Sequence, residues 1–175
     1  PDNFQRVMTY VQDLTFNYNY QSSAVKSAEY RDEDWKAAKD LMALAASADS
    51  VSVVGVATSS YASPEGEINL NEDLAMKRAN SANKAVSREL AQKKIALDEA
   101  ALRAMPKGED WEGFKKAMRA SEIADKDLIL RVLEMYSDKN KREDEIKNIA
   151  KTYSEIEERI LPDLRRSQVA ITYTV

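Results

Sequence analysis

The chain has 175 residues, a formal net charge of −4 and a pI of about 5.1. It contains no cysteine and no histidine, which excludes disulfides, thiolate nucleophiles, Cys/His zinc sites and imidazole general bases. The acidic balance gives no electrostatic reason to bind nucleic acid, and no apolar stretch approaches the roughly 20 residues of a membrane-spanning helix.

The N-terminal part of the sequence carries strand and helix patterns in turn. Polar and apolar residues alternate over 12–20, which predicts a half-buried strand. An earlier alternation through Val7, Thr9 and Val11 has the opposite phase and is a candidate for a separate short strand. Apolar residues at helical spacing then predict a helix over 35–46.

The following segments repeat this alternation once and then become helical. A short, nearly continuous apolar run over 51–57 predicts a central strand. After a loop over 59–66, a helix is expected to begin near Asn69 or Asn71, with Asn69 and Glu72 in the form of a capping box. The remaining predicted elements are helices over 109–120, 125–136 and 139–160 and a last strand over 168–175.

This order of elements predicts one sheet with helices packed on it. We expect residues 97–161 to be a helical insertion before the last strand, either a satellite layer or a long crossover. The length fits one domain, so 1–175 is predicted to be a single domain. Since the chain opens without methionine and ends inside an expected strand, we also expect it to be a fragment of a larger protein.

The most specific pattern in the chain lies between Tyr61 and Ala79. Its glycine, Gly66, is followed at short fixed intervals by Asn71, Leu74 and Arg78. This pattern resembles the OmpA-like peptidoglycan-binding family, whose loop reads Gly-His-Thr-Asp-x-x-Gly and whose next helix reads Asn-x-x-Leu-Ser-x-x-Arg-Ala. The spacing from the loop glycine to the arginine is kept without a gap.

Two further features agree with this resemblance, which covers about 14–90 and 164–175. The Ala-Ser-Pro-Glu-Gly form of the loop is similar to that of Bacteroidetes members, and Arg165-Arg166 matches the family's Arg-Arg before the last strand. The resemblance implies an α/β sandwich of the α+β class with a mixed sheet. It also implies a periplasmic location in a Gram-negative cell envelope, associated with the outer membrane, as part of a larger envelope protein.

The resemblance implies ligand capture rather than catalysis. In the family, the loop aspartate and the helix arginine hold the charged ends of diaminopimelate, as charge-assisted pairing requires. The candidate ligand-binding residues here are therefore Arg78 and Asn71 on the helix, with Tyr61, Ser63 and Glu65 in the loop. Ser63 stands where the family has aspartate, Tyr61 replaces its histidine, and Glu65 is the candidate substitute carboxylate.

Each of these residues also has a structural alternative. In the structural alternative, Arg78 pairs with a carboxylate such as that of Glu65, or donates hydrogen bonds to loop carbonyls. Ser63 is then a turn residue and Asn71 a helix-start residue. Arg165-Arg166 are expected to clamp the last strand to an acidic surface.

Two functions follow as hypotheses. The first is non-catalytic attachment of an outer-membrane-associated protein to peptidoglycan through the stem peptide. The second is a degenerate OmpA-like fold that scaffolds protein–protein contacts without binding peptidoglycan, motivated by Ser63 and the helical insertion. No catalytic constellation, metal site or cofactor is expected, because adjacent acidic pairs on helices diverge and glycine-rich phosphate loops are absent. Other envelope proteins are candidate partners, whereas nucleic acid and direct membrane insertion are not expected.

Overall fold

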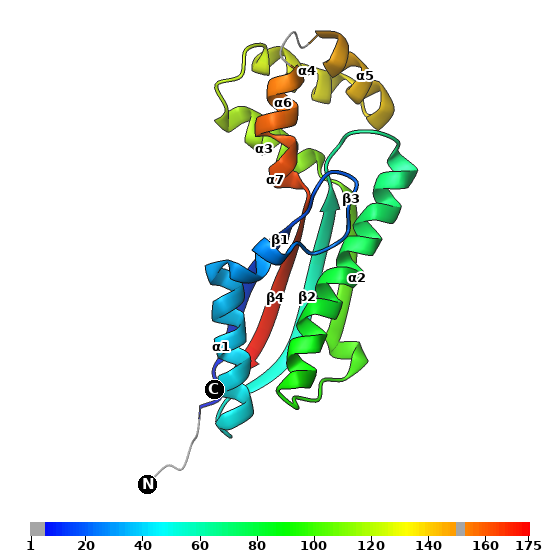
Figure 1. Ribbon diagram of the computed structural model, residues 1–175. Helices are drawn as coiled ribbons and strands as arrows, with labels where there is room; N and C mark the ends of the chain where they lie inside the picture. The colour runs from blue at the N-terminus through cyan, green and yellow to red at the C-terminus, as the bar shows by residue number, and fades with distance from the viewer. Residues whose placement is uncertain (1–5, 150–152) are drawn as a thin grey trace.

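The computed structural model describes residues 6–149 and 153–175 and has an α+β fold (Figure 1). Its four-stranded mixed sheet has the order β1-β4-β2-β3. β4 is antiparallel to both of its neighbours, while β2 and β3 are parallel. The strands are β1 (Thr9–Asn17), β2 (Ser52–Ala62), β3 (Leu102–Glu109) and β4 (Arg166–Thr174).

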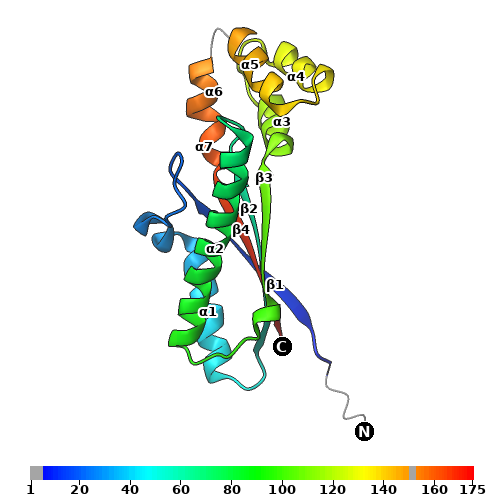
Figure 2. The ribbon, with the colours of Figure 1, turned by 90° about the vertical axis from the view of Figure 1, so that its right-hand side faces the viewer.

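Two helices, α1 (Glu33–Ser47) and α2 (Ile68–Gln92), lie on the same side of the sheet, as Figure 2 shows. Between them and the strands lies the main core, because alternate strand residues and one face of each helix are apolar. α2 presents small side chains, including the fully buried Ala79 and Ala82, which allow it to approach the sheet closely. The Phe16 and Trp35 rings add an aromatic contact with their centroids 5.7 Å apart.

The remaining helices, over residues 111–164, form a helical arm at the end of the sheet where β3 finishes and β4 begins (Figure 1). The arm has its own hydrophobic cluster, built around residues such as Phe114, Ile129 and Ile156. Its helices are α3 (Trp111–Ala120), α4 (Lys126–Met135), α5 (Lys139–Ile149), α6 (Tyr153–Arg159) and α7 (Leu161–Leu164). Part of the predicted helix 139–160, residues 150–152, lies outside the described residues.

The expected helical insertion over 97–161 is wrong at its start, because residues 102–109 form β3. Within the part of the chain that the structure describes, this strand is paired only with β2. It contains Pro106 and Gly108, which an edge strand tolerates because one side of its backbone needs no partner. The two residues, together with the absence of an alternating pattern, leave the segment without the sequence pattern of a strand. The parallel β2–α2–β3 unit is therefore complete before the arm begins.

Two smaller expectations also fail. The opposite-phase alternation at Val7–Val11 is not a separate strand, because β1 runs unbroken from Thr9 to Asn17. The Asn69–Glu72 capping box is absent: α2 begins at Ile68, its N-cap is Glu67, and no side chain caps it. Among the described residues, no helix is both long and apolar enough to cross a membrane.

Candidate functional site

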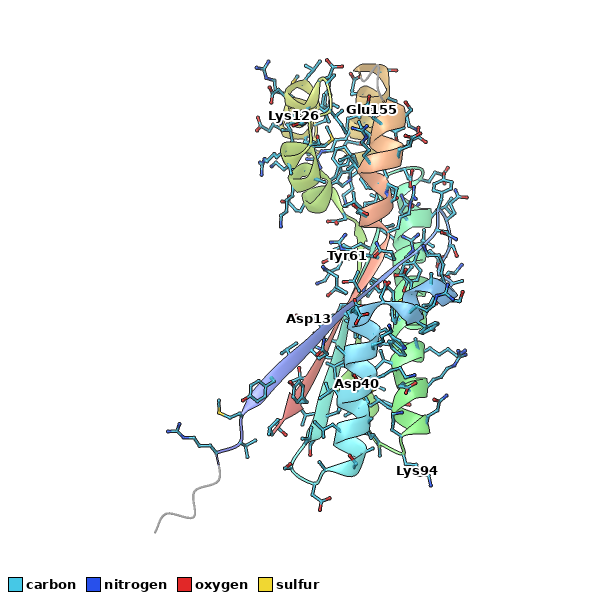
Figure 3. All side chains as sticks on the ribbon, turned by 60° about the vertical axis from the view of Figure 1, so that its left-hand side comes forward. Asp13, Asp40, Tyr61, Lys94, Lys126 and Glu155 are labelled. Carbon is cyan, nitrogen blue, oxygen red and sulfur yellow. The ribbon has the colours of Figure 1, made fainter. Side chains whose placement is uncertain are left out.

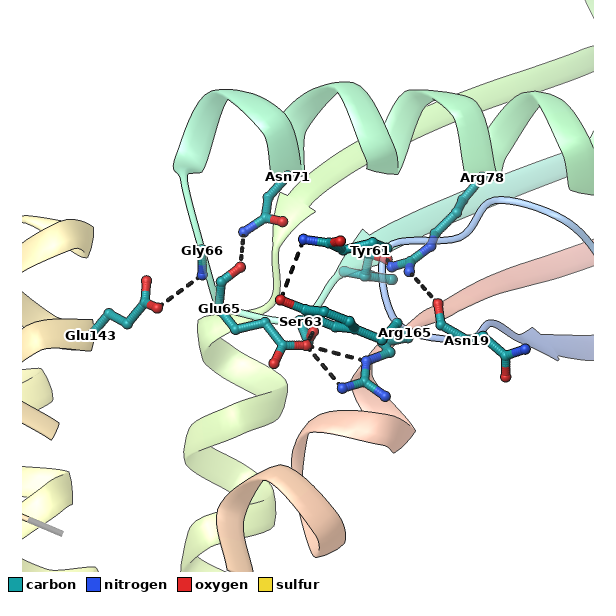
Figure 4. A network of polar contacts seen from close by, with 11 residues as sticks. Asn19, Tyr61, Ser63, Glu65, Gly66, Asn71, Arg78, Glu143 and Arg165 are labelled. Atoms are coloured by element: carbon teal, nitrogen blue, oxygen red, sulfur yellow. Dashed lines mark hydrogen bonds and ion pairs between the residues drawn. The ribbon is translucent and has the colours of Figure 1, made fainter. Parts of the chain in front are cut away.

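The loop between β2 and α2 brings all five candidate residues into one region (Figure 4). β2 ends at Ala62, and Ser63 and Pro64 turn inward and are buried. Gly66 has φ +81°, a conformation that L side chains rarely adopt, so glycine is required at this turn. Figure 3 shows Tyr61 where the sheet meets the helical arm.

Arg78 is the most constrained member of the site. Its side chain is fully buried, with 0% exposure, although it is the largest such side chain in the described chain. Its Nε donates to the carbonyl oxygen of Ser22 at 2.9 Å and its Nη1 to that of Tyr61 at 2.9 Å. Its Nη2 donates to the carbonyl of Asn19 at 3.3 Å. The structural alternative for Arg78, loop carbonyls as partners, is therefore the one observed.

The surroundings of Arg78 keep it charged and fixed. Burial lowers its pKa to about 10, so the guanidinium is still protonated at neutral pH. The carbon Cζ lies 5.1 Å from the centroid of the Tyr18 ring, a cation–π contact. Arg78 thus ties α2 to the β1–α1 loop and to the end of β2.

A buried hydroxyl network lies beneath the arginine. Tyr18 Oη donates to the Arg78 carbonyl at 3.1 Å and lies 2.8 Å from Ser167 Oγ. Ser60 Oγ is 2.6 Å from Ser167 Oγ. Burial raises the pKa of Tyr18 to about 12, so its phenol remains a donor at neutral pH. The network joins β2, β4 and α2, and its three hydroxyl groups bond to one another or to the Arg78 carbonyl.

Glu65, the candidate substitute for the family aspartate, is already paired. Its Oε1 accepts from Arg165 Nη2 at 2.9 Å and from Arg165 Nε at 3.2 Å. Ser63 Oγ donates to the same oxygen. Since the Glu65 and Arg165 side chains are about one-eighth exposed, at 12% and 13%, the pair is largely shielded from water.

The side chains of Asn71 and Tyr61 also make contacts within the protein. Asn71 Nδ2 donates to the Glu65 carbonyl at 2.7 Å and to Glu109 Oε2 at 2.7 Å. Arg166 lies over the Tyr61 ring, with Cζ 4.2 Å from the centroid. The expected clamping role of the two terminal arginines agrees with this geometry, since Arg165 pairs with Glu65 and Arg166 Nη1 contacts an acidic partner, Asp110 Oδ2, at 2.6 Å.

Among the residues of the site that the sequence did not indicate, Glu143 of α5 comes from the helical arm. Its Oε1 accepts the backbone N–H of Gly66 at 2.9 Å and pairs with Lys147 Nζ at 2.9 Å. The helical arm therefore reaches back onto the β2–α2 loop (Figure 4). No local pattern marks this residue, because it belongs to a strongly charged helix in which many side chains resemble it.

Three residues of the site, Glu65, Gly66 and Asn71, also border open space. A cavity of about 340 Å³ is bordered by the β1–α1 loop, the β2–α2 loop and α2, with Ser23, Glu67 and Lys77 among its lining residues. Lys77 Nζ pairs with Asp73 at 3.0 Å, and both side chains are more than half exposed. Within the described ranges, no group of three or more acidic side chains is placed to hold a metal ion.

Restoring the family aspartate at Ser63 is expected to destabilise the fold. Ser63 is 4% exposed and donates to the Glu65 carboxylate, so Ser63→Asp replaces a donor with a second negative charge. We expect a loss of about 1–3 kcal/mol in the free energy of unfolding, measured by urea denaturation. Ser63→Asn, with the same size and no charge, is the control and should lose less. Equal stability of Ser63→Asp and wild type would contradict the buried placement of this residue.

The comparisons with known proteins give likenesses to solved structures but none to a sequence family. No family model matches the sequence, and no curated protein matches it significantly. Among solved structures, the peptidoglycan-associated lipoprotein from Burkholderia pseudomallei is similar, with a TM-score of 0.43 and 13% sequence identity. The match covers 90% of this chain and 88% of that chain. At this identity and score, the likeness carries no functional argument.

Proposed function

We propose that residues 1–175 are one non-catalytic OmpA-like domain of the cell envelope, with the helical arm inserted between β3 and β4. We propose further that it acts as a protein–protein interaction scaffold and does not capture a peptidoglycan stem peptide. The loop-to-arginine spacing supports the family assignment. A periplasmic, outer-membrane-associated location, as part of a larger envelope protein, belongs to the same proposal.

The observation that carries the scaffold function is the complete burial of Arg78. A guanidinium that binds a ligand carboxylate must offer at least one free N–H pair toward solvent. Each of the Nε, Nη1 and Nη2 atoms of Arg78 donates to a backbone carbonyl. Releasing the side chain would leave those partly buried carbonyls without their present donors, and an unsatisfied polar group costs roughly 1–3 kcal/mol where it is shielded from water. The carboxylate of Glu65 is likewise engaged, by Arg165.

A second candidate, peptidoglycan attachment, is favoured by the cavity beside the loop. Glu67 and Lys77 both line it, so a zwitterionic group would meet a carboxylate and an ammonium there. Both are surface groups, and solvent-exposed ion pairs contribute only about 0–1 kcal/mol. Attachment through this cavity would therefore be weak and sensitive to salt.

Co-sedimentation with purified sacculi separates the two functions. We expect the wild-type domain to remain in the supernatant at the same fraction as in a sample without sacculi. The test pair is Lys77→Ala, at the cavity, and Lys84→Ala, an exposed position further along α2. Pelleting of the wild type that Lys77→Ala weakens and Lys84→Ala does not would establish the second candidate and contradict the scaffold.

A further inference from the structure

At one edge of the sheet, side chains protect only half of the edge strand from pairing with another strand. β1 pairs with β4 along one side, and its other side is an edge. In the second half of β1, acidic side chains occupy that edge: the N–H of Thr15 donates to Asp34 Oδ2 at 2.8 Å, and the N–H of Asn17 donates to Glu29 Oε1 at 2.6 Å. Capping of this kind prevents another strand from pairing there.

The first half of β1 has no such caps. Met8 and Val175 exchange both backbone hydrogen bonds, so even-numbered residues of β1 point their N–H groups at β4 and odd-numbered ones point away. The N–H groups of Thr9, Val11 and Asp13 therefore face outward. Among the described residues, no group accepts a hydrogen bond from them.

Exposed apolar side chains gather on this half-strand and on the two residues that precede it. Val7 is 72% exposed and Val11 is 55% exposed, and Met8 and Tyr10 are also exposed. Figure 2 shows this half of β1 projecting away from α1 and α2. An unpaired backbone edge combined with exposed apolar side chains is the pattern of a strand that pairs with another strand.

The opposite edge of the sheet, which β3 forms, differs in composition from the first half of β1. β3 carries Pro106, Lys107 and Arg103, of which all three are exposed. Proline removes a donor and charged side chains repel an incoming strand, so β3 has the usual protection against edge pairing. Between Thr9 and Asp13, β1 has no proline and only one charged side chain, that of Asp13.

We propose that a second copy of this chain pairs with the open half of β1, antiparallel and centred on Val11. In that register Val11 faces Val11 of the second copy, and Thr9 faces Asp13 in both directions. Each pair exchanges two backbone bonds, giving about six in total. The hydroxyl of Thr9 can donate to the carboxylate of Asp13, and no like charges face each other, which favours self-pairing in this register.

The register and the dimer are tested together, and neither depends on the proposed function. Sedimentation velocity of the wild type over a range of micromolar concentrations is expected to show a monomer–dimer equilibrium. Val11→Lys would place two ammonium groups opposite each other and should weaken dimerisation at least about tenfold. Leu70→Lys, at an equally exposed apolar position on α2, is the control and should dimerise as the wild type does.

The absence of cysteine in the chain allows a second readout. In the proposed register the Cα atoms of the two copies of residue 11 lie about 5.5 Å apart, which is within disulfide range. Mild oxidation should therefore cross-link Val11→Cys into a dimer. Thr9→Cys is the matched control, because its two copies are displaced by about 13 Å along the strands. A wild type that stays monomeric throughout, or equal cross-linking of the two cysteine variants, would overturn the proposal.

Discussion

Arg78→Met is expected to lower the free energy of unfolding by about 3 kcal/mol or more. Methionine keeps the apolar stem of the side chain but supplies no donors. The carbonyls of Asn19, Ser22 and Tyr61 would then be left without the donor that now satisfies them. Urea denaturation followed by circular dichroism measures the change as a lower midpoint at an unchanged slope.

The neighbouring residue supplies the control for this prediction. Lys77→Met, one position earlier on α2, changes a side chain that is 63% exposed, and the free energy of unfolding should change by no more than about 0.5 kcal/mol. If Arg78→Met were as stable as Lys77→Met, the guanidinium would be available to a ligand. The scaffold function would then lose its main support.

Ile129→Ala is expected to loosen the helical arm by about 2–5 kcal/mol while leaving the sheet core intact. Ile129 is 0% exposed and belongs to the arm's own hydrophobic cluster, which is separate from the cluster between the sheet and α1 and α2. Residues that share no cluster are expected to respond independently.

Hydrogen exchange followed by mass spectrometry locates this effect. Amides of α3 and α4 should exchange faster in Ile129→Ala, whereas those of β2 and β4 should keep their protection. Leu128→Ala, at an adjacent and 43% exposed position, is the control and should leave both regions unchanged. Equal loss of protection in β2 and in α4 would mean that the arm and the sheet unfold as one unit.

The elements with regular periodicity were predictable from the sequence. The helices at 33–47 and 111–120 match the predicted ones closely, because each presents one apolar face. The strand ending at Thr174 was predicted from strict alternation. β3 was not, because an edge strand that contains Pro106 and Gly108 is held by its pairing with β2 rather than by its own composition.

The sequence indicated a region of the chain for the candidate site, but it did not indicate whether the polar side chains there are free or hydrogen-bonded. The structure brings Ser63 and Glu65 of the loop close to Tyr61 at the end of β2 and to Asn71 and Arg78 on α2 (Figure 4). Whether Arg78 was free depended on the carbonyls of Asn19, Ser22 and Tyr61. Every residue has a backbone carbonyl, whatever its side chain. A pattern of residue types therefore does not indicate which carbonyls accept hydrogen bonds from Arg78.

The sequence by itself determined the chemistry that is available to this protein: no thiol, no imidazole, a net charge of −4, and an arginine, Arg78, at a fixed spacing after Gly66. The tertiary structure decided how that chemistry is used. It gives Arg78 and Glu65 internal partners, and it leaves the outer edge of the first half of β1 without a partner among the described residues. Composition and periodicity depend on residue types along the chain. The state of a polar group depends on which donors and acceptors the fold brings within hydrogen-bond distance, including those from distant segments.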